Sequence, residues 1–153
     1  MSNMKQKYTE EELKEQLDTA IEIAAHFHKG QRDKNNEIYL FHPIRIMMPM
    51  ETYEEKMVAI LHDVIEDTEC TLEILQEKLG NLNVVEAMDA ITRRNGEEYF
   101  TYIERVSKNP IARKIKIWDL RDNLSRRGAS LELQERYKKA LGVLLNDEKE
   151  SLS

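Results

Sequence analysis

Apolar residues recur at helical spacing along most of the 153-residue chain. Near its start, Thr9 is followed three residues later by Glu12, which is the pattern of a capping box at a helix N-terminus. Beyond it, apolar side chains repeat every three to four residues from Leu13 to Phe27. Gly30 readily adopts the left-handed conformation at which helices end. The pattern therefore predicts a first helix that stops near Gly30.

The rest of the chain follows the same period, interrupted by short polar stretches. Further helices are predicted at about 42–48, 54–65, 71–79, 83–93, 97–106, 109–123 and 131–145. Pro43 and Pro110 each stand in a first helical turn, where the missing N–H costs nothing. Residues 31–41 form a polar loop whose end, 38–41, could be a short extended piece. We therefore expect an all-α helical bundle of about seven to eight helices.

Composition agrees with this fold class and indicates the number of domains. Glycine and proline are scarce, at 5 and 3 residues, so few turns are forced. A chain of 153 residues fits one domain, here 1–153, with its core at about 9–146 and a frayed end at 147–153. The single cysteine, Cys70, allows no intrachain disulfide, which favours a reducing, cytoplasmic location.

Charge and hydropathy narrow the range of partners. The formal net charge of −6 argues against a general nucleic-acid binder, whose footprint is basic. An anionic small molecule is still compatible, because a bound metal ion can dominate the local field. No apolar run approaches the roughly 20 residues needed to span a bilayer, and the polar N-terminal stretch does not resemble a signal peptide. We expect neither a nucleic-acid nor a membrane partner.

Four residues could together bind a metal ion. His62 and Asp63 are adjacent near the end of a predicted helix, where neighbouring side chains point about 100° apart. Two ligands are too few for a strong site, but His42 opens an earlier helix and Asp119 lies near the end of a later one. Two imidazoles and two carboxylates suit Mn²⁺, Fe²⁺, Co²⁺ or Zn²⁺ better than Ca²⁺. Four such ligands on an octahedral ion would leave positions for water or phosphate, as a catalytic site requires.

Two further carboxylates could perform proton chemistry beside this metal. Glu66 follows His62 by four residues and Asp67 follows Asp63 by four. In a continuous helix, each would lie one turn beyond a proposed ligand. A carboxylate there can deprotonate a metal-bound water, whose pKa can fall to about 7, or protonate a leaving group. Hydrolysis of a phosphate ester requires this combination.

Plain structural roles are open to the same residues. His42 could simply cap the helix that begins at Pro43, and the acidic residues from Asp63 to Asp67 could form a solvated face. His26 is expected at the surface. A core role is expected for a further set of residues: His28, Phe41, Met47, Met48, Met50 and Trp118.

Four separated blocks of the sequence resemble the hydrolase domain of the RelA/SpoT family, and especially its small stand-alone members, the small alarmone hydrolases. The blocks are His28-x-Gly30-Gln31, Tyr39-x-x-His42-Pro43, Leu61-His62-Asp63-Val64-Ile65-Glu66-Asp67-Thr68 and Lys116-x-x-Asp119-x-x-x-Asn123. The resemblance runs over about residues 18–127, and the order and spacing of the blocks make it specific.

This resemblance implies an all-α fold of the HD superfamily, one bound Mn²⁺ and removal of the 3′-pyrophosphate from (p)ppGpp. The metal ligands of the family match His42, His62, Asp63 and Asp119. Its two catalytic carboxylates match Glu66 and Asp67, and its substrate-contacting asparagine matches Asn123.

The loop that holds the base in that family is altered in this chain. The family usually has Arg-Lys after the Gly-Gln-x step, where this chain has Asp33-Lys34. Lys34 matches a phosphate-binding lysine, and Arg32, one place earlier, could substitute for the missing arginine. In the late block, Asp122 replaces a usual histidine beside Asn123. Further cations that could meet phosphates are Arg45, Lys116, Arg121, Arg126 and Arg127.

Three functions are open on these grounds. The first is a metal-dependent phosphohydrolase of the guanosine 3′,5′-bis(diphosphate) 3′-pyrophosphohydrolase type, using a metal-bound hydroxide. The second is an HD phosphohydrolase for a different nucleotide or nucleoside monophosphate, since Asp33 disfavours the guanine-holding role. The third is a nucleotide-sensing or interaction module without turnover, against which the intact polar positions argue. Apolar residues on the last helix could also form a homodimer face.

Overall fold

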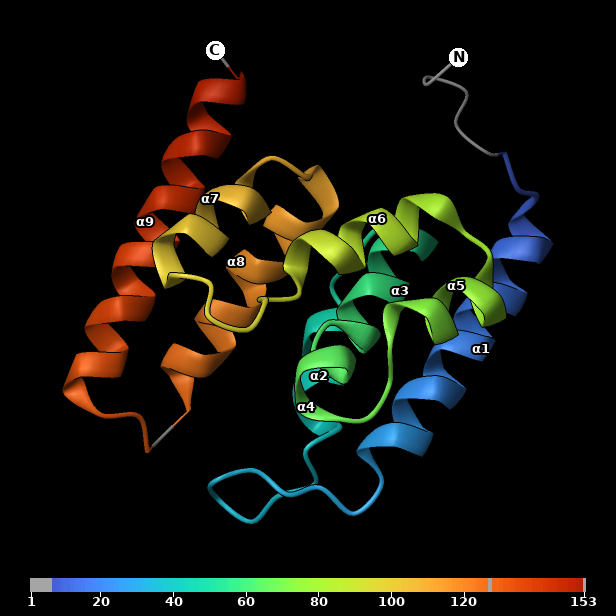
Figure 1. Ribbon diagram of the computed structural model, residues 1–153, viewed down its shortest axis with the longest axis horizontal. Coiled ribbons are helices and arrows are strands. Elements are labelled where there is room, and N and C mark those ends of the chain that lie inside the picture. Colours follow the sequence, from blue (N-terminus) through green and yellow to red (C-terminus); the bar gives the residue numbers. More distant parts are fainter. Residues whose placement is uncertain (1–6, 127, 153) are drawn as a thin grey trace.

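The computed structural model describes residues 7–126 and 128–152, with side chains described as far as Asn146. Within these residues the chain forms nine helices and no named strand (Figure 1). They are α1 (Glu10–His28), α2 (Phe41–Met47), α3 (Tyr53–Leu61), α4 (Val64–Asp67), α5 (Leu72–Leu79), α6 (Leu82–Ile91), α7 (Tyr99–Ser107), α8 (Pro110–Ser125) and α9 (Leu131–Leu152). The all-α prediction is confirmed.

Helix ends follow the chemistry of the flanking residues. Thr9 and Glu12 form the predicted capping box at α1, and Thr52 forms a second one at α3. Asn109 caps α8 through the backbone N–H of Ala112 at 2.9 Å, with Pro110 in the first turn. These caps satisfy backbone donors that a helix start leaves without partners.

Helix α3 forms the centre of the part of the bundle that carries the functional residues. Its neighbours are α1, α2, α6 and α8, while α9 packs on α7 and α8 at the other end (Figure 1). The side chains from Met57 to Leu61 are all at most 1% exposed. Because α3 is surrounded along this length, the residues that follow Leu61 begin their path in the interior of the protein.

The helix predicted at 54–65 is two helices, and this part of the prediction was wrong. Helix α3 ends at Leu61 and α4 begins at Val64, with His62 and Asp63 at the break. The Ala59 carbonyl accepts from both the backbone N–H of His62, at 3.5 Å, and its Nδ1, at 2.7 Å. In a continuous helix this carbonyl would accept from Asp63. Competition by the imidazole therefore explains the break.

The predicted core roles of three residues and the predicted end of the last helix also need correction. Phe41, Met48 and Trp118 are 43%, 68% and 37% exposed, so they lie at the surface and not in the core. Phe41 and Met48 lie at the two ends of α2 and Trp118 lies on α8. Apolar helical spacing marks one face of a helix but does not show whether another helix covers that face. The last helix continues to Leu152, so the backbone of 147–152 is helical where a frayed end was expected. Ser153 and Arg127 lie outside the described residues.

None of the described helices combines the length and the apolarity that a bilayer crossing needs.

The loop that follows α1 is closed by a short antiparallel bridge between Arg32 and Ile38. This loop forms one wall of a cavity.

Asn81 is a fully buried residue that joins α6 to α1. Its Oδ1 accepts from the backbone N–H of Val84 at 3.2 Å, and its Nδ2 donates to Gln16 at 2.9 Å. Asn81→Ala removes a helix cap and leaves buried polar groups without partners, so the free energy of unfolding should fall by about 1–3 kcal/mol. Urea unfolding measures this change. The control Asn95→Ala, at an exposed position, should change it by less than about 0.5 kcal/mol, and equal losses would contradict the assignment.

Candidate metal centre and adjoining pocket

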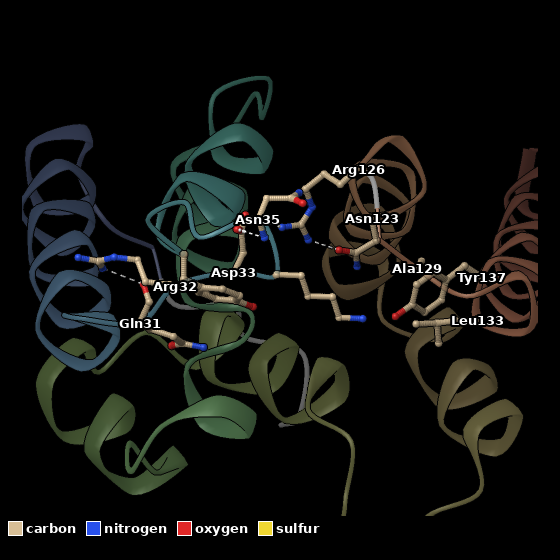
Figure 2. Close-up of a pocket in the computed structure, with 11 residues that line it drawn as sticks. Gln31, Arg32, Asp33, Asn35, Asn123, Arg126, Ala129, Leu133 and Tyr137 are labelled. Carbon is tan, nitrogen blue, oxygen red and sulfur yellow. Dashed lines mark hydrogen bonds and ion pairs between the residues drawn. The ribbon is translucent and has the colours of Figure 1, made fainter.

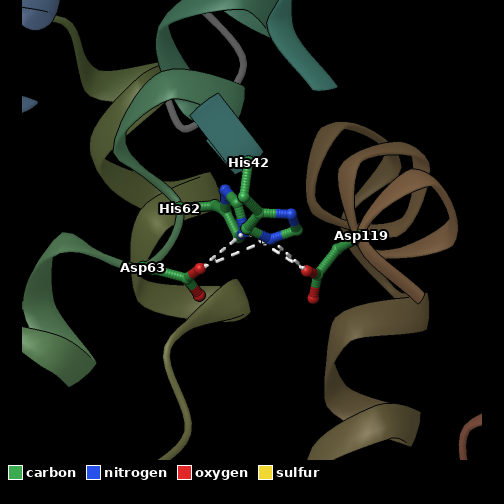
Figure 3. Close-up of side chains that lie close together, drawn as sticks. All are labelled: His42, His62, Asp63 and Asp119. Atoms are coloured by element: carbon green, nitrogen blue, oxygen red, sulfur yellow. Dashed lines mark hydrogen bonds and ion pairs between the residues drawn. The ribbon is translucent and has the colours of Figure 1, made fainter. Parts of the chain in front are cut away.

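Side chains from three parts of the fold meet in one cluster. His42 projects from α2, His62 and Asp63 lie at the break between α3 and α4, and Asp119 comes from α8 (Figure 3). One possible ligand atom from each lies within 4.8 Å of the other three. His42 and His62 are 2% exposed and Asp119 is 3% exposed. The structure thus brings together all four residues at which the sequence predicts a metal site.

Both imidazoles are oriented by a hydrogen bond from the outer nitrogen. His62 Nδ1 donates to the Ala59 carbonyl oxygen at 2.7 Å. His42 Nδ1 donates to the Asp122 carboxylate at 2.5 Å, because an ionised carboxylate can only accept. In each ring Nε2 therefore faces the cluster, and in the neutral ring this nitrogen carries the lone pair that a metal needs.

The inner atoms of the cluster are placed as ligands of one ion would be. His62 Nε2 lies 3.0 Å from Asp63 Oδ2 and 3.4 Å from Asp119 Oδ1. His42 Nε2 lies 2.9 Å from the same Asp119 oxygen. Among the described residues, buried His62 Nε2 has no hydrogen-bond partner, and a cation between these atoms would satisfy it. Two nitrogen and two oxygen donors fit a divalent transition metal.

The charges in this cluster strongly perturb one another. Burial lowers the pKa of both imidazoles, but the adjacent carboxylates outweigh burial, so the pKa of His42 and that of His62 are raised above 6.5. Burial raises the pKa of Asp63, but His62 outweighs it and brings this pKa to about 2. Lys116 and His62 likewise hold the pKa of Asp119 well below 3.8 against the effect of burial.

Lys116 neutralises the outer side of Asp119. Its Nζ donates to Asp119 Oδ2 at 2.9 Å and lies 5.4 Å from the centre of the Tyr102 ring. Asp119 Oδ1 is therefore the oxygen that faces the imidazoles. Because Lys116 is paired with Asp119, its charge is already used and is not available to a phosphate. Two other candidate cations are engaged elsewhere: Arg45 binds Asp122, and Arg121 lies over the Trp118 ring.

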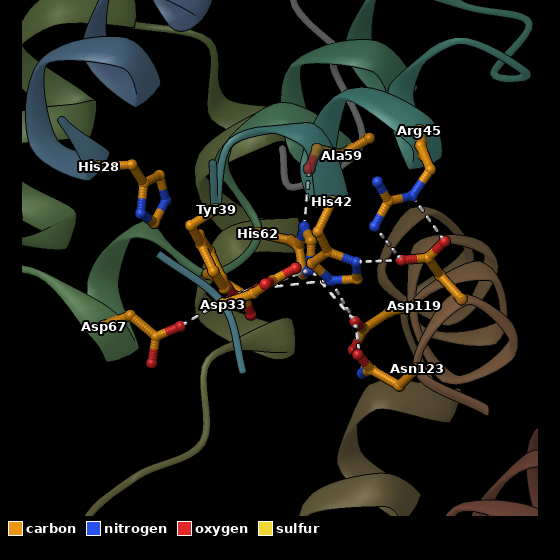
Figure 4. Close-up of polar contacts among 12 residues, drawn as sticks. His28, Asp33, Tyr39, His42, Arg45, Ala59, His62, Asp67, Asp119 and Asn123 are labelled. Carbon is orange, nitrogen blue, oxygen red and sulfur yellow. Dashed lines mark hydrogen bonds and ion pairs between the residues drawn. The ribbon is translucent and has the colours of Figure 1, made fainter. Parts of the chain in front are cut away.

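Glu66 and Asp67 lie beside the cluster on α4. The Tyr39 hydroxyl is within hydrogen-bonding distance of Asp63 and, at 3.1 Å, of Asp67, so one phenol joins a predicted ligand to a predicted catalytic group (Figure 4). Glu66 accepts from the backbone N–H of Arg93. Both carboxylates reach solvent. Partial burial nevertheless raises the pKa of each, and the charge of Asp63 adds to this effect.

The helix break modifies the argument that placed these two carboxylates. They do not continue α3, as the sequence pattern suggested, but follow a sharp change of direction. The backbone N–H of Asp67 still donates to the Asp63 carbonyl at 3.0 Å, so this pair remains one turn apart. Asp67 therefore lies close to Asp63, as predicted, although the local structure is a helix break and not a continuous helix.

A cavity of about 260 Å³ adjoins the cluster (Figure 2). It is lined by Gln31, Arg32, Asp33, Lys34, Asn35, Tyr39, Asn123, Arg126, Ala129, Leu133 and Tyr137. Two lining residues contact the cluster directly, since Tyr39 bonds to Asp63 and Asn123 Nδ2 donates to Asp119 Oδ1 at 3.1 Å. A molecule in this cavity would lie against the cluster.

All three residues predicted to bind substrate line this cavity. Asn123 does so from α8, and Lys34 from the loop after α1. A Cβ on Gly128 would lie 3.9 Å from Lys34 Cδ, so the lysine reaches across toward the opposite wall. The Arg32 guanidinium instead donates to the Gln31 carbonyl at 3.1 Å, and Figure 2 shows it on the far side of the loop from Asn123.

Asp33 is occupied in holding the loop together. Its Oδ1 accepts from the backbone N–H groups of Asn35 at 2.8 Å and Glu37 at 2.9 Å. Its Oδ2 lies 3.6 Å from Arg126 Nη1. These hydrogen bonds outweigh partial burial and lower the pKa of Asp33, and Arg126 contributes further. The carboxylate that replaces the expected arginine is thus already neutralised by groups of the protein.

Several site residues had no specific role in the sequence analysis. Tyr39 was part of a recognised block, but nothing in the sequence showed that its hydroxyl meets two carboxylates. Leu133 and Tyr137 follow the apolar period of the last helix, which indicates core and not a cavity wall. Arg126 was one of several candidate cations, and the structure distinguishes it as a lining residue.

Comparisons with known proteins show what the chain is similar to. No protein-family model matches the chain. The chain is 27% identical over 122 residues to the guanosine-3′,5′-bis(diphosphate) 3′-pyrophosphohydrolase of Aquifex aeolicus. The aligned region covers 72% of this chain and 17% of that protein. It is 32% identical over 97 residues to the bifunctional (p)ppGpp synthase/hydrolase SpoT of Escherichia coli, covering 61% and 14%. The chain thus spans about a sixth of the length of these curated relatives.

A solved structure gives the corresponding result for the fold. It is that of a metazoan ortholog of SpoT that hydrolyzes ppGpp, and it matches with a TM-score of 0.70 and 24% identity over 93% of this chain and 88% of that chain. The chain therefore has the helical-bundle fold of that structure, and its own His/Asp cluster could hold a divalent metal. In sequence the chain is similar to these ppGpp-hydrolysing relatives, a similarity that the four blocks of sequence also indicate.

Metal binding should compete with protonation of the two imidazoles. In the metal-free protein, the raised pKa of His42 and His62 contributes stability that is fully present below pH 6.5 and is lost as pH rises through the raised values. A metal needs both rings neutral. We expect the rise in melting temperature caused by a fixed Mn²⁺ concentration to grow from about pH 6 to about pH 8.5. Thermal unfolding with and without Mn²⁺ measures it.

Two histidine variants make this measurement specific. His62→Ala should remove the Mn²⁺-dependent rise, whereas His26→Ala, at an exposed position on α1, should preserve it. A rise that does not depend on pH, or one that persists in His62→Ala, would show that the ion binds elsewhere.

Proposed function

We propose that this protein is a metal-dependent phosphohydrolase that removes the 3′-pyrophosphate from guanosine 3′,5′-bis(diphosphate). The observation that carries the proposal is that Tyr39 and Asn123 line the cavity and also hydrogen-bond to carboxylates of the His/Asp cluster. A phosphate of a nucleotide in the cavity could therefore reach the cluster. The named activities of the curated relatives give the substrate to test first.

The metal that we propose is Mn²⁺, held by His42, His62, Asp63 and Asp119, with Fe²⁺, Co²⁺ and Zn²⁺ compatible with the same donors. When bound, such an ion supplies Lewis acidity toward a phosphoryl oxygen and lowers the pKa of a coordinated water. The protein contributes the orientation of both Nε2 atoms and two carboxylates whose charges the site itself compensates.

We assign the proton transfers to Glu66 and Asp67. A general acid or base works best when its pKa lies near the working pH, and both groups have a raised pKa. Asp67 is oriented by Tyr39, which also contacts Asp63. Glu66 is oriented by the backbone N–H of Arg93. Each carboxyl thus has one fixed hydrogen bond and a solvent-accessible side that can exchange a proton.

The cavity offers separate surfaces for the two halves of a nucleotide. Lys34 provides positive charge for phosphates, and Asn123 can hydrogen-bond beside it. The opposite wall, from α9, presents Leu133 and the ring of Tyr137, surfaces on which a base or sugar can pack (Figure 2). Since Asp33 is paired with Arg126 and backbone N–H groups, it does not place an uncompensated negative charge beside a phosphate.

A different nucleotide is a second candidate substrate, and one observation favours it. The loop arginine expected to hold guanine is absent, and the Arg32 guanidinium lies on the far side of the loop from Asn123. The base is then selected mainly by Leu133 and Tyr137, whose apolar surfaces do not distinguish guanine by hydrogen bonds. Location in the cytoplasm and self-association through the last helix remain predictions from the sequence.

The direct test is release of pyrophosphate from ppGpp by the purified protein with Mn²⁺. Glu66→Gln keeps the shape of the side chain but removes its proton chemistry, so turnover should fall by about 10²–10⁴-fold. The matched control Glu69→Gln changes an exposed carboxylate just beyond α4 and should leave turnover unchanged. Both variants should bind Mn²⁺ as the unchanged protein does.

Each alternative gives a distinct result in the same assay. Activity on other nucleotides without activity on ppGpp would retain the chemistry and reject the substrate. Binding of ppGpp and Mn²⁺ without turnover of any nucleotide would contradict the proposed hydrolase and indicate a sensing module.

A further inference from the structure

Asp122 lies outside the proposed ligand set but touches it. Its Oδ2 is 2.5 Å from His42 Nδ1, and its side chain is 14% exposed. It follows Asp119 by three residues on α8, so both carboxylates lie on one face of that helix. The His42 ring is held between them, because its Nε2 is 2.9 Å from Asp119 Oδ1.

Asp122 is itself held in place by a two-point contact. Arg45 Nε donates to Asp122 Oδ1 at 3.0 Å, and Arg45 Nη2 donates to Asp122 Oδ2 at 3.1 Å. Arg45 follows His42 by three residues on α2 (Figure 4). A paired contact of this kind restricts the orientation of a carboxylate more than a single hydrogen bond does. One helix thus supplies the imidazole and the guanidinium, and the other supplies both carboxylates.

The two imidazoles of the cluster differ in their outer partners. His62 Nδ1 donates to a neutral backbone carbonyl, that of Ala59. His42 Nδ1 donates to a charged carboxylate, which is a stronger acceptor. A carboxylate on the outer nitrogen fixes the tautomer of the ring and increases the basicity of the inner nitrogen toward a metal.

We propose that Asp122 is a positioning residue of the metal centre: it holds the Nδ1–H tautomer of His42, strengthens Nε2 as a ligand and is itself oriented by Arg45. This proposal rests on the metal site proposed above and not on the identity of the substrate. The alternative is a purely structural role, in which the Asp122 carboxylate would only join α2 to α8 through Arg45.

Two variants separate these roles. Asp122→Asn keeps the size of the side chain but removes its charge, and its amide can meet Nδ1 as a donor or as an acceptor. We expect the affinity for Mn²⁺, measured by calorimetric titration of the metal-free proteins, to fall by about 10–100-fold. Arg45→Gln breaks the same contact between the helices but leaves the carboxylate on His42. It should weaken Mn²⁺ binding by at most about threefold.

The His42 tautomer can be read directly in the unchanged protein. Nitrogen NMR of the Zn²⁺-loaded, ¹⁵N-labelled protein should show a proton on Nδ1 of His42 and a metal shift on Nε2. This measurement retains its value if Asp122→Asn does not fold. Equal losses of Mn²⁺ affinity in the two variants, no loss in either, or a metal-bound Nδ1 would overturn the role of Asp122. Failure of the unchanged protein to bind Mn²⁺ would overturn the metal site itself, and activity on ppGpp enters none of these readouts.

Discussion

Two imidazoles and two carboxylates meet in the interior of this protein, where water solvates them poorly, and their mutual attraction is the interaction on which the site depends. A buried carboxylate without a partner would cost several kcal/mol, so each charged group needs a compensating neighbour. Lys116 compensates the outer oxygen of Asp119, and the imidazoles compensate its inner oxygen. Helices α2 and α8 and the break after α3 each bring one or more members of the cluster to the same point.

The break after α3 is the local feature that makes this meeting possible. The His62 imidazole that faces the cluster through Nε2 donates to the Ala59 carbonyl through Nδ1, so this proposed ligand itself ends the helix that precedes it. The change of direction then places Asp63 against Tyr39 and leads into α4 with Glu66 and Asp67. His62 therefore both ends α3 and contributes to the cluster. Tyr39 lines the cavity and contacts Asp63, so it connects the cavity to the cluster.

Much of this arrangement could be predicted from the sequence, but in an uneven way. Caps such as Thr9-x-x-Glu12 and the apolar period located the helices, and four spaced blocks indicated the residues of the His/Asp cluster. The break at His62 could not be predicted, because apolar spacing continues from Met57 through Val64 and a competing side-chain hydrogen bond leaves no trace in that spacing. Trp118 and Met48 were misplaced because periodicity shows which face is apolar but not whether another helix covers it. In the sequence, Asp122 is only a replacement of the histidine usual in the family, since its contact with His42 is seen only in the fold.

The central claim is that one divalent ion binds between these four side chains. Anomalous scattering at the manganese absorption edge, from crystals grown with Mn²⁺, tests this most directly. We predict one strong peak, about 2.0–2.3 Å from His42 Nε2, His62 Nε2 and one oxygen each of Asp63 and Asp119. A peak elsewhere, or ligation through an Nδ1 atom, would contradict the account, as would full Mn²⁺ occupancy at a site that lacks any of the four residues.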